Sequence, residues 1–284
     1  MSTLMLVHAH PDDEAISTGG VMMRAHEDGH RVVLVTGTRG EEGEIHNMDE
    51  ATVRPHLAQV RVAELLRACE ILGVDRQEFL GYRDSGMAGT PANDNPSSFH
   101  LAPLHEAADR LAVLLREERP DVVVTYTSDG TYGHPDHIKA HHTTVAALDV
   151  LDREGWAPAK FYLSAVPRGF MQEMLRMAQE AGMEMPETGM RILGIPDEEI
   201  TTSVDVREFA ERKRQAFGAH VSQNDPNSPF QTMAGQRLQD PDRKPFQLDR
   251  CHALASDAPA VARHYPKWYT GGEHIEPAEE GDHH

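Results

Sequence analysis

Cysteine is scarce in this chain of 284 residues, which contains only Cys69 and Cys251. The two lie far apart and outside any C-x-x-C spacing, which argues against a disulfide framework and against a cysteine-rich zinc site. We therefore interpret both residues as free thiols. Long apolar runs are absent as well, since no stretch approaches the roughly 20 apolar residues of a membrane-spanning helix.

Positive charge is the next shortage. The chain has 27 Lys and Arg against 46 Asp and Glu, a formal net charge of −19, which disfavours nucleic acid and anionic membrane surfaces as partners. The first apolar run starts at Leu4, almost at Met1, so no secretory signal is expected. The composition thus predicts a soluble, cytoplasmic protein with no nucleic-acid and no membrane partner, while its oligomeric state stays unknown.

Strand and helix patterns alternate along the first 167 residues. Valine-rich or apolar strands are expected at 4–10, 30–38, 78–82, 121–127 and 160–167. Helical periodicity is expected at 15–27, 56–72, 104–118 and 135–153. This alternation predicts an α/β fold, a Rossmann-like parallel sheet with helices on both faces. A long loop at 83–100 interrupts it, and loops of this length are usually functional or mobile.

The remainder of the chain is harder to interpret. Residues 168–273 are expected to form a smaller, irregular C-terminal section packed on the α/β core of residues 1–167. Helices are expected within it at 171–182 and 206–220, and short strands at 191–195 and 201–206. Residues 274–284 are expected to be a disordered tail.

Eighteen histidines are many for this length, and two groups of them occupy equivalent places. "HAHPDDE" (8–14) follows the first strand, and "GTYGHPDHIKAHH" (130–142) follows the strand at 121–127. Pro and acidic residues are common at helix starts, so both could be ordinary helix entries. Capping does not require histidine, however. In open parallel sheets ligands bind at the carboxyl ends of strands where the strand order reverses, and that position would bring both groups into one crevice.

Catalytic zinc sites use three protein ligands, commonly imidazoles and a carboxylate, and leave a position for water. His10, Asp13 and His137 would supply such a set, and Asp12 would be free to act as a base. Ferrous iron also accepts these ligands. A nucleotide-binding module is a poorer interpretation, because the first strand-to-helix turn lacks G-x-G-x-x-G and carries carboxylates that would repel phosphate.

"AHPDDE" (9–14) together with "GHPDH" (133–137) resembles the LmbE-like, or PIG-L, family of zinc-dependent N-deacetylases. The likeness in layout covers roughly residues 4–165. Three further stretches resemble the branch that acts on N-acetylglucosaminyl-inositol and on mycothiol conjugates: "RVVLVTGTRGEEGEI" (31–45), "YRDSGMAGT" (82–90) and, more weakly, "HVSQ" (220–223).

The resemblance implies roles for residues at the matching positions. His10, Asp13 and His137 would bind one Zn²⁺ per chain, and Asp12 would be the general base acting on the metal-bound water. His134 would lie by the developing oxyanion. The resemblance also implies that Asp136 orients His134 and favours its charged form, and that Tyr132 lies near the substrate carbonyl. The residues implied to contact the substrate are Arg61, Asp84 and Glu41.

The implied function is zinc-dependent removal of the acetyl group from an N-acetylglucosamine-containing small molecule. One alternative is a mycothiol S-conjugate amidase, which would cleave the amide between glucosamine and cysteine with the same metal and base. Another is a metal- or sugar-binding protein without catalysis, which would not need Asp12. His8, His141 and His142 are interpreted as packed or solvated residues, and Glu14 as either a support for a ligand or a helix-start carboxylate.

Overall fold

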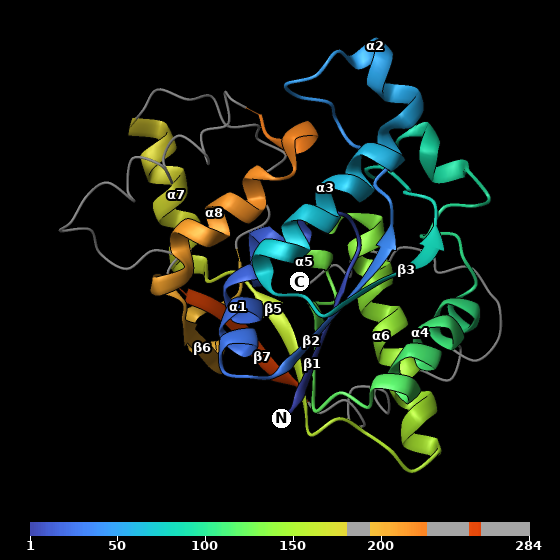
Figure 1. The fold of residues 1–284 in the computed structure, drawn as a ribbon, viewed down its shortest axis with the longest axis vertical. Coiled ribbons are helices and arrows are strands. Elements are labelled where there is room, and N and C mark those ends of the chain that lie inside the picture. Colours follow the sequence, from blue (N-terminus) through green and yellow to red (C-terminus); the bar gives the residue numbers. More distant parts are fainter. Residues whose placement is uncertain (181–193, 226–249, 257–284) are drawn as a thin grey trace, which may run out of the picture.

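The apolar run at the start of the chain forms an inner strand of a seven-stranded sheet (Figure 1). The computed structural model describes residues 1–180, 194–225 and 250–256. The strand order across the sheet is β3-β2-β1-β4-β5-β7-β6. The strands are β1 (Thr3–His8), β2 (Arg31–Thr38), β3 (Arg76–Tyr82), β4 (Val122–Tyr126), β5 (Lys160–Ala165), β6 (Thr202–Asp205) and β7 (Arg250–Ser256).

Helices connect most of these strands. Among the described residues they are α1 (Gly19–Glu27), α2 (Glu50–Val53), α3 (Leu57–Leu72), α4 (Leu104–Glu118), α5 (Gly130–Gly133), α6 (Pro135–Arg153), α7 (Arg168–Glu180) and α8 (Ala210–Gly218). A π-helical turn, Glu14–Thr18, precedes α1 directly. The helices expected at 104–118 and 135–153 are confirmed, and the one expected at 56–72 agrees to within a residue. The helix expected at 15–27 corresponds to the π-helical turn and α1 taken together.

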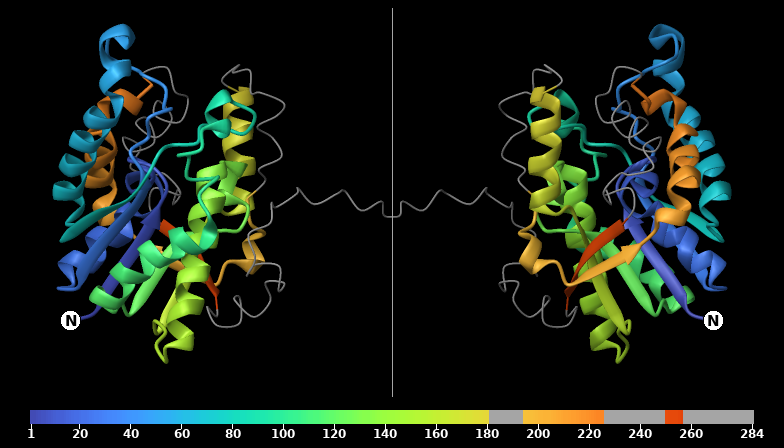
Figure 2. Two further views of the ribbon diagram at one scale, coloured as in Figure 1. Left: turned by 90° about the vertical axis from the view of Figure 1, so that its right-hand side faces the viewer. Right: turned by 90° about the vertical axis from the view of Figure 1, so that its left-hand side faces the viewer.

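Helices cover both faces of the sheet, as the views from the two sides show (Figure 2). Successive side chains of a strand point to opposite faces. Met5 and Val7 of β1 therefore pack with α4 and α6, whereas Leu4 and Leu6 pack in a second cluster with α1, α3 and α8. This confirms the α/β fold with two covered faces.

The strand order reverses between β1 and β4. From β1 the sheet continues through β2 to β3 on one side, and from β4 to β5 on the other, and these five strands are parallel. The carboxyl ends of β1 and β4 are therefore neighbours at the switch point, with Leu6 opposite Val124. The two histidine-containing segments follow these two strand ends, as the sequence predicted.

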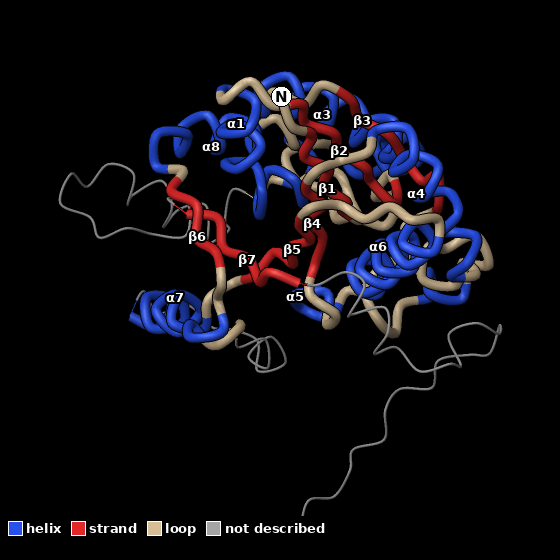
Figure 3. Tube along the Cα trace, turned by 90° about the horizontal axis from the view of Figure 1, so that it is seen from below, coloured by secondary structure: helices blue, strands red, loops and turns tan. Residues whose placement is uncertain are grey.

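The five strands of residues 1–167 are parallel, as expected, and two further strands from the C-terminal part make the whole sheet mixed. β7 pairs antiparallel with β5, and β6 pairs antiparallel with β7, so the C-terminal part of the chain extends the sheet (Figure 3). The strand at 201–206 was expected, but β7 was missed, because "RCHALAS" is a short apolar run without clear alternation. The short helix α2 was also missed within the polar turn after β2; Asp49 caps it by accepting a hydrogen bond from Thr52 N.

Some expectations fall on parts of the chain outside the described residues. These are the tail at 274–284 and most of the strand at 191–195, of which Ile195 forms an isolated bridge with Pro167. The boundary at residue 167 stays a prediction. Over the described ranges, no helix combines the length and the apolar character needed to cross a membrane.

Candidate metal centre

Both histidine-containing segments begin a helix and place side chains at the switch point. His134 has extended backbone angles and caps α6, its Nδ1 accepting a hydrogen bond of 3.1 Å from Asp136 N. Pro135 occupies the first turn. Gly130 makes the turn before it at φ 66°, and a Cβ there would lie 2.8 Å from His137 Cβ. The segment therefore serves both as a helix entry and as a source of site residues.

His10, Asp13 and His137 lie together. The Asp13 carboxylate bridges the two imidazoles, with Oδ2 3.5 Å from His10 Nδ1 and Oδ1 3.3 Å from His137 Nε2. His10, His134 and His137 also each offer a nitrogen within 4.8 Å of the others. These donors fit a divalent metal ion.

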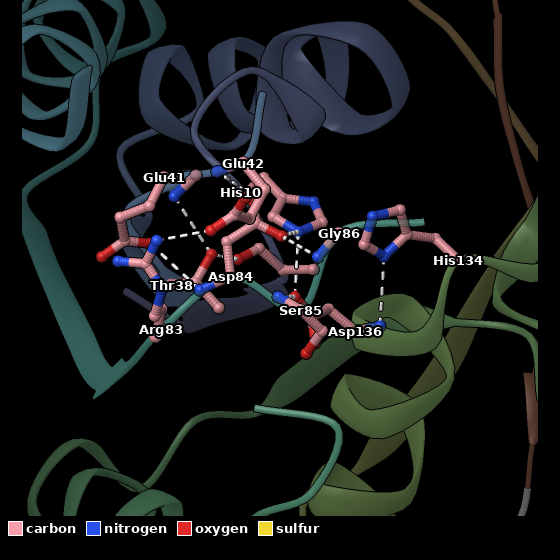
Figure 4. A network of polar contacts seen from close by, with 12 residues as sticks. His10, Thr38, Glu41, Glu42, Arg83, Asp84, Ser85, Gly86, His134 and Asp136 are labelled. Carbon is pink, nitrogen blue, oxygen red and sulfur yellow. Dashed lines mark hydrogen bonds and ion pairs between the residues drawn. The ribbon is translucent and has the colours of Figure 1, made fainter. Parts of the chain in front are cut away.

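The other nitrogen of His10 is held by carboxylates. Its Nε2 lies 3.2 Å from Asp136 Oδ2 and 3.4 Å from Asp84 Oδ1 (Figure 4). Burial alone would lower the pKa of His10, but the carboxylates of Asp84, Asp13 and Asp136 raise it well above its ordinary value. A ligating histidine commonly donates its second N–H to a carboxylate in this way, which leaves Nδ1 to face the metal.

Asp136 contacts His134 through its backbone and His10 through its carboxylate. Its carboxylate accepts hydrogen bonds from Ser85, through the backbone N–H at 2.9 Å and through the hydroxyl, and faces His10. Its backbone N–H, not its carboxylate, orients the ring of His134. Burial and the neighbouring imidazoles of His10 and His137 lower the pKa of His134 to about 4. This shift favours the neutral imidazole, although the Asp136 carboxylate acts in the opposite direction and favours the charged form. In the neutral form the proton lies on Nε2, because Nδ1 accepts from Asp136 N.

Asp12 lies beside this cluster in an unusual backbone conformation, with φ 119°. Its Oδ2 accepts a hydrogen bond of 3.1 Å from Arg61 Nη2. Burial raises the pKa of the Asp12 carboxyl to about 6, against the opposing effect of the Arg61 guanidinium. A carboxylate with a pKa in this range suits a general base near neutral pH.

The three residues expected to contact substrate have different surroundings. Arg61 is buried and donates to the carbonyls of Pro11 and Gly40 as well as to Asp12. Asp84 is buried, faces His10, and accepts a hydrogen bond of 2.8 Å from Gly86 N. The His10 imidazole and this N–H lower the pKa of Asp84, although burial would raise it. Glu41 is partly exposed and accepts from Asp84 N at 3.0 Å. A direct role of any of the three in substrate binding stays a prediction.

Tyr132 and the remaining histidines lie around this centre. The Tyr132 side chain is 42% exposed, and its hydroxyl lies 3.4 Å from His137 Nε2. His8 is fully buried between Tyr126 and Thr18, and His141 is buried with Nδ1 2.8 Å from the Tyr126 carbonyl, so both are packed residues as expected.

Sequence reasoning missed three supporting residues. Tyr126 donates a hydrogen bond of 2.8 Å to Asp13 Oδ2, and Ser85 holds Asp136. His220, the first residue of "HVSQ", forms a buried ion pair with Glu14 at 2.7 Å. The resemblance of "HVSQ" to known relatives was a signal for His220, but periodicity gave none for the other two.

Fold and donors together define a class, an α/β protein whose switch point carries histidine and aspartate donors that could hold a metal ion, with a further carboxylate beside them. The model of the family described as PIG-L, GlcNAc-PI de-N-acetylase, matches residues 5–148. The 1D-myo-inositol 2-acetamido-2-deoxy-alpha-D-glucopyranoside deacetylase of Acidothermus cellulolyticus is 44% identical over 251 residues, covering 83% of this chain and 85% of the relative. The chain therefore belongs to the PIG-L family.

Solved structures show the same fold with different chemistry. The N,N'-diacetylchitobiose deacetylase of Pyrococcus horikoshii has a TM-score of 0.61 at 19% identity, covering 94% of this chain and 87% of its own. The 4-carboxy-2-hydroxymuconate hydratase of Pseudomonas putida has a TM-score of 0.54 at 17% identity, covering 97% of this chain and 100% of its own. Since the second is named as a hydratase, the fold alone does not define the reaction.

Proposed function

We propose that this protein is a zinc-dependent deacetylase that hydrolyses the acetamide of an N-acetylglucosaminyl-inositol, releasing acetate and the free amine. One observation carries the proposal: Asp12, with its pKa near 6, lies next to the His10, Asp13 and His137 donors. The 44% identity to a relative named as a deacetylase of this acetamido sugar supports the substrate.

The metal would supply electrophilic chemistry. When bound, zinc would polarise the amide carbonyl and make water more acidic. His10, Asp13 and His137 would hold it, because two imidazoles and a carboxylate suit zinc, although ferrous iron accepts the same donors.

Proton transfer is assigned to Asp12. In its ionised form it takes a proton from the attacking water and then delivers it to the nitrogen of the breaking C–N bond, so that the amine leaves neutral. General base and acid work of this kind commonly contributes about 10²- to 10⁴-fold to the rate.

The developing oxyanion is stabilised by neutral donors. His134 presents an Nε2–H, because its Nδ1 accepts the Asp136 backbone N–H. Burial raises the pKa of Tyr132, so its phenol stays protonated and able to donate. Such preorganised donors stabilise the charge that develops at the carbonyl oxygen in the transition state. Glu41, with part of its surface exposed, is assigned to a sugar hydroxyl, in the neighbourhood that Arg61 and Asp84 hold in place.

The test is product detection with matched substrates. Zinc-replete protein and Asp12→Ala are incubated with N-acetylglucosaminyl-inositol, free N-acetylglucosamine and a mycothiol S-conjugate, and acetate and free amine are measured. Acetate from the inositol conjugate, lost in the variant, supports the proposal. Amine without acetate, from the mycothiol conjugate alone, would establish the amidase instead. No product from any substrate at full zinc occupancy contradicts both enzymatic interpretations.

A further inference from the structure

The peptide bond between Pro11 and Asp12 is held at both ends. Arg61 Nη2 donates to the Pro11 carbonyl, and Asp12 N donates to Glu14 Oε2 at 2.9 Å. Asp12 has φ 119°, which an L residue adopts only when its surroundings enforce it. The direction of the Asp12 carboxylate follows from this backbone conformation. The contacts of Arg61 and Glu14 therefore determine where the carboxylate points.

Glu14 is itself held by a residue 206 positions further along the chain. Its second oxygen, Oε1, lies 2.7 Å from His220 Nε2. Both side chains are fully buried. Burial alone would lower the pKa of His220, but the Glu14 carboxylate raises it, so the imidazole is favoured in its charged form against Glu14. The two oxygens of Glu14 thus join His220 to the backbone of Asp12.

The segment that carries His220 is fastened to the rest of the fold independently of Glu14. Ser222 donates two hydrogen bonds of 2.7 Å to the buried carboxylate of Glu64 in α3, from its backbone N and its hydroxyl. His46 N donates to the Ser222 carbonyl at 2.8 Å. These contacts fix the position of residues 220–223, so the imidazole of His220 is held in place against Glu14.

We propose that Glu14 and His220 are positioning residues that hold Asp12 in the orientation needed for proton transfer. The proposal rests on the assignment of Asp12 as the base of the proposed deacetylase. In the described part of the chain, the Glu14 and His220 side chains form no hydrogen bond or ion pair with His10, Asp13 or His137, and they reach Asp12 through its backbone N–H. The last helical segment of the described chain, α8 and residues 220–223, is thereby coupled to a base near the N-terminus.

The experiment compares variants of the zinc-replete, full-length protein in the acetate-release assay. Glu14→Ala removes the acceptor for Asp12 N and is expected to lower kcat about 10- to 100-fold, because a displacement of about 1 Å can cost that much. KM is expected to change less than threefold, and bound zinc to stay at one per chain. Glu14→Gln keeps a carbonyl oxygen for Asp12 N and is expected to recover most of the lost rate.

His220 is tested in the same way. His220→Ala leaves Glu14 buried without its partner, and a fall in Tm is expected together with the fall in kcat. His220→Gln keeps an N–H donor for Glu14 and is the variant to use where His220→Ala does not fold. Its kcat is expected to lie between those of the wild type and Glu14→Ala.

Repeating the Glu14 substitution in the Asp12→Ala protein separates an effect on the position of Asp12 from a general structural effect. Once Asp12 is replaced by Ala there is no base to position, so adding Glu14→Ala to Asp12→Ala is expected to lower the residual rate less than twofold. Glu211→Gln, which changes an exposed carboxylate on α8, is the matched control and is expected to leave kcat within twofold of the wild type.

Two results would overturn the proposal while leaving the deacetylase assignment intact. One is an active wild type whose kcat is unchanged in folded Glu14→Ala. The other is an equal loss from Glu14→Ala with and without Asp12, which indicates a general structural effect. An inactive wild type at full zinc occupancy would instead refute the proposed function on which the inference rests.

Discussion

The carboxylate of Asp136 lies against His10, with Oδ2 3.2 Å from Nε2, and both groups are buried. Ser85 binds the same carboxylate through its backbone N–H and its hydroxyl. Asp136, in the segment after β4, therefore holds His10, the proposed metal ligand in the segment after β1. This contact joins the two histidine-containing segments directly.

This contact predicts that Asp136→Asn weakens metal binding. An amide replaces the charge that holds His10 Nε2–H, and loss of such an outer contact typically costs about 10- to 100-fold in metal affinity. The measurement is a chelator competition for zinc. Asp109→Asn, which changes an exposed carboxylate on α4, is the control. Unchanged zinc affinity in Asp136→Asn would contradict this role.

A second chain of hydrogen bonds orients Asp13. Tyr126 has one hydroxyl proton and gives it to Asp13 Oδ2, so it accepts from Ala9 N and from His8 Nδ1–H. His8 Nε2 lies 2.8 Å from the Thr18 hydroxyl. The chain of donors ends on a carboxylate in its ionised form, which is the form that binds a metal.

Tyr126→Phe is accordingly expected to weaken zinc binding about tenfold with little change in fold. The same chelator competition measures it. Tyr162→Phe, which removes a hydroxyl from β5 away from the site, serves as the control. If both variants bind zinc as the wild type does, the Tyr126 hydroxyl has no part in orienting Asp13.

The pKa of Asp12 near 6 predicts the acid side of the activity profile. Asp12 works as a base only when ionised, so kcat/KM is expected to fall about tenfold per pH unit below pH 6 and to level off above it. In Asp12→Ala the residual rate should lack this dependence. Bound zinc must be measured at each pH, because protonation of His10 competes with the metal. An identical acid limb in Asp12→Ala, with zinc still bound, would rule out Asp12 as its origin.

Glu118 provides a test of stability away from the site. Its carboxylate binds Arg31 through two hydrogen bonds of 2.7 and 3.0 Å and Arg76 through one of 2.8 Å. Its side chain is 9% exposed, and hydrogen bonds from these guanidinium groups lower the pKa of Glu118 to about 2. Because folding lowers this pKa, the stabilisation is fully present above the ordinary value near 4.3 and is lost as the pH falls towards 2.

Glu118→Gln is therefore expected to lower the free energy of unfolding by about 1–2 kcal/mol at pH 7. The difference from the wild type should shrink between pH 5 and pH 3 in urea titrations. Glu117→Gln, which changes a half-exposed neighbour paired with Arg76, is expected to cost less than about 0.5 kcal/mol. If the difference in free energy of unfolding between the wild type and Glu118→Gln does not vary with pH, the ionised carboxylate is not its cause.

The meeting of the two histidine-containing segments was predictable from the sequence for a physical reason. Parallel strands that alternate with helices place their carboxyl ends at one edge, so residues after β1 and β4 had to be neighbours once those strands flanked the switch point. The position of His10, Asp13 and His137 followed from this rule and from the donor chemistry of zinc.

Other relationships depend on tertiary packing that no local pattern encodes. Nothing in "HPDH" distinguishes an Asp136 carboxylate that faces His10 from one that faces His134. The pairing of Glu14 with His220 spans 206 positions and depends on where α8 ends. β7 is placed between β5 and β6 by pairing partners far away in the sequence, not by its own weak pattern.

The central claim is that a metal held by His10, Asp13 and His137 is needed for hydrolysis of the acetamide. The most direct measurement is acetate release from N-acetylglucosaminyl-inositol during titration of metal-stripped protein with zinc, alongside His137→Ala. The account predicts that the rate rises with zinc up to one equivalent per chain in the wild type and stays near background in the variant. Full acetate release from metal-stripped protein, or an equal rate in His137→Ala, would contradict it.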